Sequence, residues 1–334
     1  MRKIMEKLSH NSIFKYKQDD SLTIKYLQIE PTNICNAACV FCIRKEKMQA
    51  PKNMDLQTLK KISSFFHAVK FVKLQGLGEC FFNPDLHILL AHLKKIYPGV
   101  VIMSSTNLNC PKTNTELSAI LENLDILYLS IDGGTKETYE KIRKGCSWDR
   151  MTKTLSQISK IKQKHNVFVI NFTASNLNYY EIEKVAELVK DLPIDELRIN
   201  PVQDWTADNR LTSPKNYSTF DYIETLRRWH RIDRINEMRV IVVGDPEFDY
   251  NRCIWPFERM YIDVHGNIFV CVISLDDQWC QGNLIKNPFG EIYQNSVFNE
   301  IRQCLKKNTP HLHCKTCSYK ILAPILRKIK ETEN

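Results

Sequence analysis

Three cysteines lie in one short loop, at Cys35, Cys39 and Cys42, with the spacing C-x3-C-x2-C. Residues 25–30 before them predict a strand, and the Pro-Thr-Asn at 31–33 predicts a turn. Three thiols on one loop can hold three corners of a cube-shaped iron–sulfur cluster, whereas an electron-transfer cluster takes four cysteine ligands. One iron would remain open, and open metal positions are typical of catalytic sites. The alternative is a loop of zinc-binding or buried cysteines, although zinc sites usually combine C-x2-C pairs from two places.

The cysteine content does not indicate a secreted, disulfide-linked protein. The chain has 12 cysteines in 334 residues, and residues 1–20 carry charges throughout with no apolar core. We therefore expect no signal peptide and a reducing, cytoplasmic location, in which thiols serve metals or catalysis. No run of about 18 apolar residues occurs, so we expect no membrane span.

The formal net charge of +9 raises the question of an anionic partner. The lysines and arginines are scattered, and their densest groups, residues 226–231 and 327–330, read as solvated helix faces. No basic stripe interleaved with aromatic residues occurs, so we expect no nucleic-acid binding. An anionic peptide or a sugar phosphate as substrate remains a second interpretation of this charge.

Strand-like and helix-like segments alternate from residue 24 to residue 202. The expected strands are short apolar runs, as in a parallel sheet whose two faces are both buried. They cover residues 24–30, 71–76, 100–107, 126–132, 168–174 and 196–202. The expected helices lie near residues 55–66, 84–97, 113–122, 135–163 and 179–190. Six such units in series predict a parallel α/β fold.

Polar or flexible residues follow the ends of successive expected strands. In parallel α/β barrels the chemistry lies at the carboxyl ends of the strands. The cysteine loop follows the first strand, and a Gly-Leu-Gly-Glu sequence at 76–79 ends the second. The later strands end on or near Asn107, Ser130, Asp132 and Asn200. We therefore expect these residues to form a ring around one site.

The segment from Glu30 to Cys42 resembles the signature of the radical S-adenosylmethionine (SAM) superfamily, including the aromatic Phe41 before the third cysteine. The resemblance implies a partial (β/α)6 TIM-like barrel over residues 22–202, after an extension at 1–21. It implies that the three cysteines hold a [4Fe–4S] cluster whose open iron binds SAM. Reductive cleavage of SAM then gives a 5′-deoxyadenosyl radical, which abstracts a hydrogen atom from the substrate. The electron would come from a flavodoxin- or ferredoxin-type reductant.

The same resemblance implies further contacts with SAM. Gly78 and Glu79 match the motif that meets its amino group, with Cys80 where the family usually has proline. Glycine allows close backbone approach, and a carboxylate complements an amine. Ser130 is implied near the ribose, and Arg143 at the carboxylate, which suits a guanidinium fork. Taken alone, the Gly-Leu-Gly-Glu sequence at 76–79 would be an ordinary turn, and Arg143 would be a surface residue of an amphipathic helix. The implied cofactor-binding set is Phe41, Gly78, Glu79, Asn107, Ser130, Asp132 and Arg143.

A second group of cysteines begins at Cys253. Residues 260–264 and 268–272 are β-rich runs joined by His-Gly-Asn, which predicts a hairpin that brings Cys271 toward Cys253. A later C-x2-C pair, Cys314 and Cys317, completes four ligands, enough to saturate a metal site. This block resembles the SPASM/twitch region of radical SAM enzymes, which implies one auxiliary [4Fe–4S] cluster used for electron transfer. A closed zinc site is the alternative.

The chain is therefore expected to have a small cysteine-rich SPASM/twitch domain of a β-hairpin and helices at residues 253–334. The alternation of strand-like and helix-like segments ends at residues 203–252, which lie between the two expected domains. They predict an irregular linker followed by an amphipathic bridging helix near 217–236.

Five cysteines lie outside both sets: Cys80, Cys110, Cys146, Cys280 and Cys304. Most of them read as small buried hydrophobic residues. Cys146 or Cys280 is a candidate donor of a hydrogen atom to a substrate radical, as a thiol is in radical epimerases. Arg198 and Asn200 on the sixth strand are candidate substrate contacts, unless they serve hydrogen bonding inside the barrel.

These features favour a radical SAM oxidoreductase that dehydrogenates or epimerises a small molecule such as an amino sugar, because the chain resembles small twitch enzymes that oxidise amino-sugar alcohols. The barrel is expected to begin within about the first 30 residues, which leaves no room for an N-terminal peptide-recognition domain. A peptide-modifying enzyme that matures ribosomal peptides is the alternative. A zinc-stabilised, non-catalytic binding protein is the alternative of another class.

Overall fold

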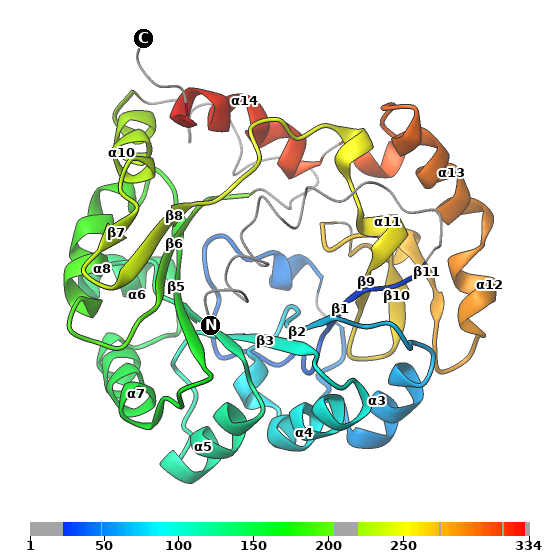
Figure 1. Ribbon diagram of the computed structural model, residues 1–334, viewed down its shortest axis with the longest axis horizontal. Helices are drawn as coiled ribbons and strands as arrows, with labels where there is room; N and C mark the ends of the chain where they lie inside the picture. The colour runs from blue at the N-terminus through cyan, green and yellow to red at the C-terminus, as the bar shows by residue number, and fades with distance from the viewer. Residues whose placement is uncertain (1–22, 48, 204–219, 274, 316, 331–334) are drawn as a thin grey trace.

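The computed structural model describes residues 23–330 apart from 48, 204–219, 274 and 316. Six parallel strands form the centre of one curved sheet with helices around its outer face, which confirms the predicted parallel α/β fold (Figure 1). The strands are β1 (Tyr26–Ile29), β2 (Phe71–Leu74), β3 (Val101–Thr106), β4 (Ile126–Ser130), β5 (Val167–Ala174) and β6 (Glu196–Pro201). The helices among them are α3 (Leu56–Ser63), α4 (Leu86–Ile96), α5 (Asn114–Glu122), α6 (Lys136–Ile142), α7 (Trp148–Ile161) and α8 (Ile182–Val189), with short 3-10 helices η1 (Ile43–Glu46), η2 (Cys80–Phe82) and η3 (Tyr179–Glu181).

The sheet continues beyond the six predicted strands on both sides. On one side β8 (Met238–Val242) runs parallel to β6 and pairs with β7 (Arg234–Ile235). On the other side β9 (Arg259–Ile262) runs parallel to β1 and is followed by antiparallel β10 (Asn267–Phe269) and β11 (Cys280–Asn283). The strand order is β11-β10-β9-β1-β2-β3-β4-β5-β6-β8-β7. One sheet therefore runs across the domain boundaries expected near residues 202 and 252.

Side chains alternate between the two faces of the central strands. Leu27, Val72 and Leu74 belong to the main core, which the sheet forms with the surrounding helices. The opposite face carries a smaller apolar cluster inside the barrel, formed by Met103, Ile126, Tyr128, Val167 and Val169 with Tyr26, Phe71 and Val101 packed against it. Half-buried polar residues on this interior face, such as Asn171 and Asn200, lie nearer the carboxyl ends of the strands.

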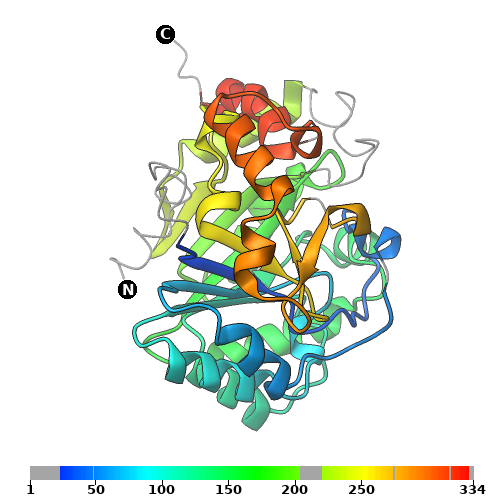
Figure 2. The ribbon, with the colours of Figure 1, turned by 90° about the vertical axis from the view of Figure 1, so that its right-hand side faces the viewer.

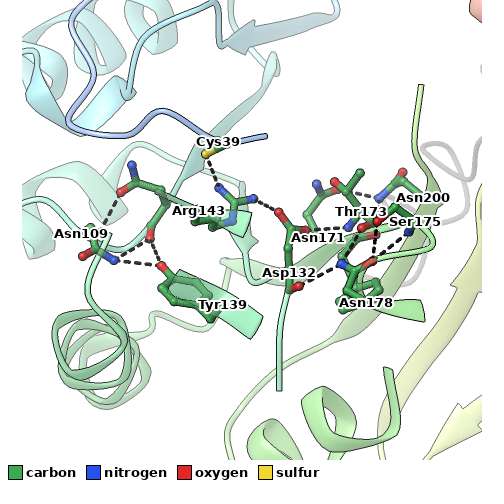
Figure 3. A network of polar contacts seen from close by, with 12 residues as sticks. Cys39, Asn109, Asp132, Tyr139, Arg143, Asn171, Thr173, Ser175, Asn178 and Asn200 are labelled. Carbon is green, nitrogen blue, oxygen red and sulfur yellow. Dashed lines mark hydrogen bonds and ion pairs between the residues drawn. The ribbon is translucent and has the colours of Figure 1, made fainter. Parts of the chain in front are cut away.

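The single helix expected over 135–163 is wrong, because the structure has two helices, α6 and α7, with a turn between them. Arg143 ends α6, and Gly145 has a φ of +89°, a conformation that glycine adopts without strain. The turn is held against the cysteine loop, since the Ala38 N–H donates to Lys144 O over 2.7 Å. Arg143 is thereby directed toward the cysteine loop and away from solvent (Figure 3).

The C-terminal third contains the expected hairpin, β9 and β10, and several helices. The helix expected near 217–236 is α10 (Phe220–His230). The others are α11 (Trp255–Glu258), α12 (Phe289–Tyr293), α13 (Ser296–Lys306) and α14 (Ser318–Lys330), with 3-10 helices η4 (Tyr250–Arg252), η5 (Asp277–Trp279) and η6 (Leu312–Cys314). Figures 1 and 2 show α14 beside α10, where the ring of strands is interrupted between β8 and β9. None of the described helices combines the length and the apolar character that crossing a membrane would require.

Candidate active site

The three cysteines of the first motif lie on the loop after β1, close enough to affect one another's ionisation. Burial raises the pKa of Cys35 to about 11, and the neighbouring thiols of Cys39 and Cys42 add to this rise, whereas the Ala37 N–H opposes it. Burial also raises the pKa of Cys39, but the positive charge of Arg143 acts against that rise. Because iron binds the thiolate form, a cation beside the loop favours the state that a cluster needs.

The cysteine loop packs against the end of β2 at a position that only glycine fits. A Cβ added to Gly78 would lie 2.1 Å from Thr32 O and 2.8 Å from Ile34 O, both of which are backbone atoms. The next residue, Glu79, donates its backbone N–H to Ile34 O over 2.9 Å. Gly78 was expected to allow close approach of the backbone to SAM, and in the structure it allows close approach of the cysteine loop.

The Glu79 side chain connects the ends of β2 and β3. It is buried, and its carboxylate accepts hydrogen bonds from the backbone N–H of Asn107 (2.7 Å) and Phe81 (3.2 Å). Burial raises the pKa of Glu79, and these donors act against the rise. Asn107 in turn donates from Nδ2 to Asn36 Oδ1 on the cysteine loop over 2.9 Å. Glu79 and Asn107 thus lie together beside the cysteines, and their contact with SAM remains a prediction.

Arg143 and Asp132, expected as separate contacts with SAM, form a buried ion pair (Figure 3). Arg143 Nη2 lies 2.6 Å from Asp132 Oδ2, and Nη1 donates to Cys39 Sγ over 3.9 Å. Asp132 Oδ1 accepts from the Thr173 N–H over 2.7 Å. The guanidinium therefore joins the cysteine loop to the ends of β4 and β5, which the sequence did not predict.

Three further side chains hold this region, and the sequence analysis missed their role. Tyr139 is fully buried, and its hydroxyl donates to Asn107 O (3.2 Å) and accepts from Asn109 Nδ2 (2.9 Å). Asn109 also accepts the Ser147 N–H, so it fixes the start of α7. Asn36, the third of these side chains, accepts the hydrogen bond from Asn107 through its Oδ1. The only signal in the sequence is the pair of asparagines two residues apart after the third strand.

The remaining expected cofactor contacts lie around the same end of the barrel. Phe41 is partly buried against the main core beside the cysteines. Ser130 is half-buried at the end of β4, opposite Asn171 of β5 in the strand register. Asn171 accepts a hydrogen bond from Asn200 Nδ2 over 2.9 Å. Asn200 is thus engaged within the barrel wall, one of the two roles considered for it.

The residues around the first cysteine loop fit an iron–sulfur cluster that binds the amino acid part of SAM. The Nε of Arg143 is buried and has no hydrogen-bond partner among the described residues, and a carboxylate would supply one. In the part of the chain that the structure describes, no three Cys, His, Asp or Glu side chains converge closely enough to hold a single metal ion.

The second group of cysteines lines one apolar cavity. Cys253, Cys271, Cys314 and Cys317 all border it, with Trp255 and Tyr319 among the other lining residues. His313 also lines the cavity; it is 6% exposed, and neither of its ring nitrogens has a hydrogen-bond partner among the described residues. Burial lowers the pKa of His313 to about 4, so the ring is neutral. Four thiols with an unpartnered donor beside them fit an iron–sulfur cluster, whose sulfur atoms accept hydrogen bonds.

The two candidate hydrogen-atom donors, Cys146 and Cys280, and the candidate substrate contact Arg198 lie in different parts of the structure. Cys146 is buried in the main core near Tyr139 and the cysteine loop. Cys280 lies at the start of β11 in a cluster that also contains Leu77 and Cys253. Arg198 is inside the barrel, where Glu196 and Tyr128 take up its donors, as described below. Their roles in catalysis remain predictions.

Comparison with known families identifies both parts of the chain. A family model described as the radical SAM superfamily matches residues 29–189, and one described as an iron-sulfur cluster-binding domain, SPASM, matches residues 253–318. The chain belongs to the radical SAM superfamily. A radical SAM enzyme with a SPASM domain requires a [4Fe–4S] cluster, SAM and auxiliary iron–sulfur binding. This does not support the non-catalytic zinc protein that we considered.

Similar proteins span most of this radical SAM chain. Mycofactocin maturase MftC of Mycobacterium tuberculosis is 22% identical over 295 residues, which cover 82% of this chain and 71% of MftC. GTP 3′,8-cyclase of Chlorobaculum tepidum is 23% identical, but the match covers 54% of this chain and 56% of the cyclase. The structure of native anSMEcpe with bound AdoMet has a TM-score of 0.66 at 18% identity, over 92% of this chain and 91% of that one. Streptococcus suis SuiB bound to its precursor peptide SuiA has a TM-score of 0.61 at 16% identity, over 86% and 71%.

A buried carboxyl group at the end of β1 predicts a dependence of stability on pH. Glu30 accepts the backbone N–H groups of Leu77 (2.6 Å) and Val264 (3.2 Å), yet burial raises its pKa to about 7. The folded protein thus binds this proton more tightly than the unfolded chain, and the free energy of unfolding falls as pH rises from about 4.5 to about 7. In Glu30→Gln, the free energy of unfolding should fall by about 3 kcal/mol less than in the wild type over this pH range. Anaerobic urea unfolding at several pH values measures this difference.

The matched control for Glu30 is Glu187→Gln, which changes the same group on an exposed helix face. Its free energy of unfolding should follow the wild-type dependence on pH. Parallel curves for Glu30→Gln and the wild type would contradict the burial-raised pKa of Glu30.

Proposed function

We propose that this radical SAM enzyme removes a hydrogen atom from a peptide and so modifies it. The observation that carries the proposal is the match to MftC, a mycofactocin maturase, because it extends over 82% of this chain. The match to GTP 3′,8-cyclase spans only about half of either protein. Two structures with the same fold were solved with peptides, anSMEcpe with the Cp18Cys peptide and SuiB with SuiA, and they support a peptide substrate here.

The proposal gives defined roles to the residues at the carboxyl end of the barrel. When bound, the [4Fe–4S] cluster and SAM supply a carbon radical that takes a hydrogen atom from the substrate and leaves 5′-deoxyadenosine. Cys35, Cys39 and Cys42 would hold the cluster, and Arg143, fixed by Asp132, would hold the loop against the barrel. The half-buried polar residues on the interior face would bind and orient the substrate.

The four cysteines of the SPASM domain would hold an auxiliary cluster beside the same space. Cys253 and Cys271 pack in a hydrophobic cluster that contains Tyr261. Tyr261 lies on the face of β9 that is directed into the barrel. The same cluster includes Leu77 from the segment after β2. An auxiliary cluster at this place would therefore adjoin the mouth of the barrel. The amino-sugar substrate expected from the sequence remains a prediction, and MftC gives it no support.

The test uses the full chain, reconstituted anaerobically and incubated with SAM and dithionite. Short peptides encoded beside its gene would be synthesised with deuterium on carbon and supplied in turn, with deuterated amino sugars as the comparison. We expect deuterium to appear in 5′-deoxyadenosine only with a peptide, and the mass of that peptide to report the modification. Transfer of deuterium from an amino sugar and from none of the peptides would refute the proposal.

A further inference from the structure

The strands on either side of β1 place polar side chains on the interior face of the barrel that have no partner among the described residues. Lys73 of β2 lies opposite Gln28 of β1 in the strand register, and Arg259 of β9 lies opposite Tyr26 of β1. Gln75 follows β2 on the same face as Lys73. Since a buried polar group costs free energy unless it is paired, this concentration on β9 and β2 needs an explanation.

Lys73 is a half-buried cation with no hydrogen bond and no carboxylate partner among the described residues. Its flanking residues Val72 and Leu74 are fully buried on the outer face, so the lysine points into the barrel. Its Nζ lies 5.1 Å from the centre of the Tyr128 ring. Burial lowers its pKa to about 8, with further lowering by the positive charges of Arg198 and Arg259.

The neighbouring Arg198, which we expected to contact the substrate, already has a carboxylate partner. Its Nε and Nη2 lie 2.6 Å and 2.5 Å from Glu196 Oε1, and its Nη1 donates to the Tyr128 hydroxyl over 3.2 Å. Glu196 also pairs with Arg239 through its other oxygen. The Glu196 carboxylate is thus shared by two arginines, and no carboxylate of the described residues pairs with Lys73.

Arg259 is the second cation without a counter-charge among the described residues. It is 8% exposed, and its guanidinium lies 4.6 Å from the ring centre of Tyr26 and 5.6 Å from that of Trp255. Its Nε and the Oε1 of Gln75 are buried, and neither has a hydrogen-bond partner in the part of the chain that the structure describes. The interior thus offers cationic donors together with the acceptor oxygen of Gln75.

We propose that Lys73 and Arg259 bind a carboxylate of the substrate inside the barrel, with Gln75 accepting a neighbouring N–H. A carboxylate supplies the counter-charge that the two cations lack, through charge-assisted hydrogen bonds. A carboxylate and an N–H side by side are the groups of an acidic peptide, so this inference rests on the proposed peptide function and narrows its substrate class. The carboxylate belongs either to an Asp or Glu side chain or to the C-terminus of the peptide.

The experiment measures binding of small probes to the reconstituted, SAM-loaded enzyme by anaerobic calorimetry. N-acetylglutamate amide carries its carboxylate only on the side chain, and N-acetylglutamine carries it only at the C-terminus. N-acetylglutamine amide is the neutral counterpart of both, and glutarate is a carboxylate without any peptide group. We expect one acidic capped amino acid to bind more tightly than the neutral one, and Lys73→Met to weaken it about tenfold or more. Which of the two binds identifies the source of the carboxylate.

Two further variants separate binding from folding. Lys136→Met removes a lysine whose ion pair with Asp149 is exposed, and it should bind the probes as the wild type does. Lys73→Met should keep or raise the melting temperature of the ligand-free protein, because it removes a cation without a partner. Arg259→Met should weaken the same probe as Lys73→Met does.

The outcomes are distinct. Unchanged affinity in Lys73→Met, equal binding of the neutral probe, or no binding of any acidic probe overturns the carboxylate site. A lower melting temperature in Lys73→Met with unchanged affinity assigns the lysine to folding and also overturns it. Binding of glutarate alone, lost in Lys73→Met, supports the carboxylate site and refutes the peptide function.

Discussion

Replacing Cys39 with alanine is expected to reduce the formation of 5′-deoxyadenosine from SAM to background. Cys39 is the middle cysteine of the loop and the one that accepts a hydrogen bond from Arg143. With two thiols left, the loop cannot hold three irons of a cluster. Anaerobic reconstitution with dithionite, followed by chromatography of the nucleoside product and iron analysis, measures the effect. The iron content should fall by the amount that one cluster holds, and the iron of the SPASM domain should be retained.

The matched control for Cys39 is Cys304→Ala. Cys304 is partly buried on α13 and belongs to neither cysteine group. Its loss should leave both iron content and 5′-deoxyadenosine formation near the wild-type values. Full activity in Cys39→Ala would show that the loop holds no cluster with an open iron.

Gly78→Ala is expected to cause a second large loss, by displacing the cysteine loop. The added Cβ would lie 2.1 Å from Thr32 O and 2.8 Å from Ile34 O, and neither backbone atom can turn away as a flexible side chain would. Overpacking of this kind typically costs about 1–3 kcal/mol of stability, and a displacement of about 1 Å can reduce catalysis about 100-fold. We therefore expect a melting temperature several degrees lower and a strongly reduced rate of SAM cleavage.

Gly290→Ala is the matched control, because a Cβ at Gly290 would meet nothing within 4 Å. Gly290 lies in α12, where alanine is a better helix former than glycine. This variant should have an unchanged or slightly higher melting temperature and wild-type SAM cleavage. Equal behaviour of the two variants would contradict the tight packing of Gly78 against the cysteine loop.

Much of the fold and the approximate position of the site could be predicted from short-range patterns. The runs that became β1 to β6 are apolar and short, and their carboxyl ends must share one edge of a parallel sheet. This rule was enough to place Glu79, Asn107 and Asp132 near the cysteine loop. The same alternation, applied to Phe-Val-Lys-Leu in β2, would also have placed Lys73 inside the barrel.

Pairing between distant residues could not be predicted, because periodicity says which face a residue occupies and not what it meets there. Arg143 and Asp132 were both identified, but nothing in the sequence indicates that they bind each other. The turn at Gly145 was missed because the helical pattern continues on both sides of it. The parallel pairing of β9 with β1 joins segments more than 200 residues apart, and only the folded chain reveals it.

That pairing has a consequence for any attempt to divide the protein. A fragment ending before Cys253 would lose β9 and leave the backbone groups of β1 unpaired along an open margin, together with Lys25, whose ion pair with Glu258 would be gone. Exposed strand margins recruit other chains, so such a fragment should aggregate instead of yielding a free-standing SAM-cleaving unit. The C-terminal cysteine region is therefore no detachable accessory, since the strand that follows Cys253 also completes the wall on which the first cysteine loop is built.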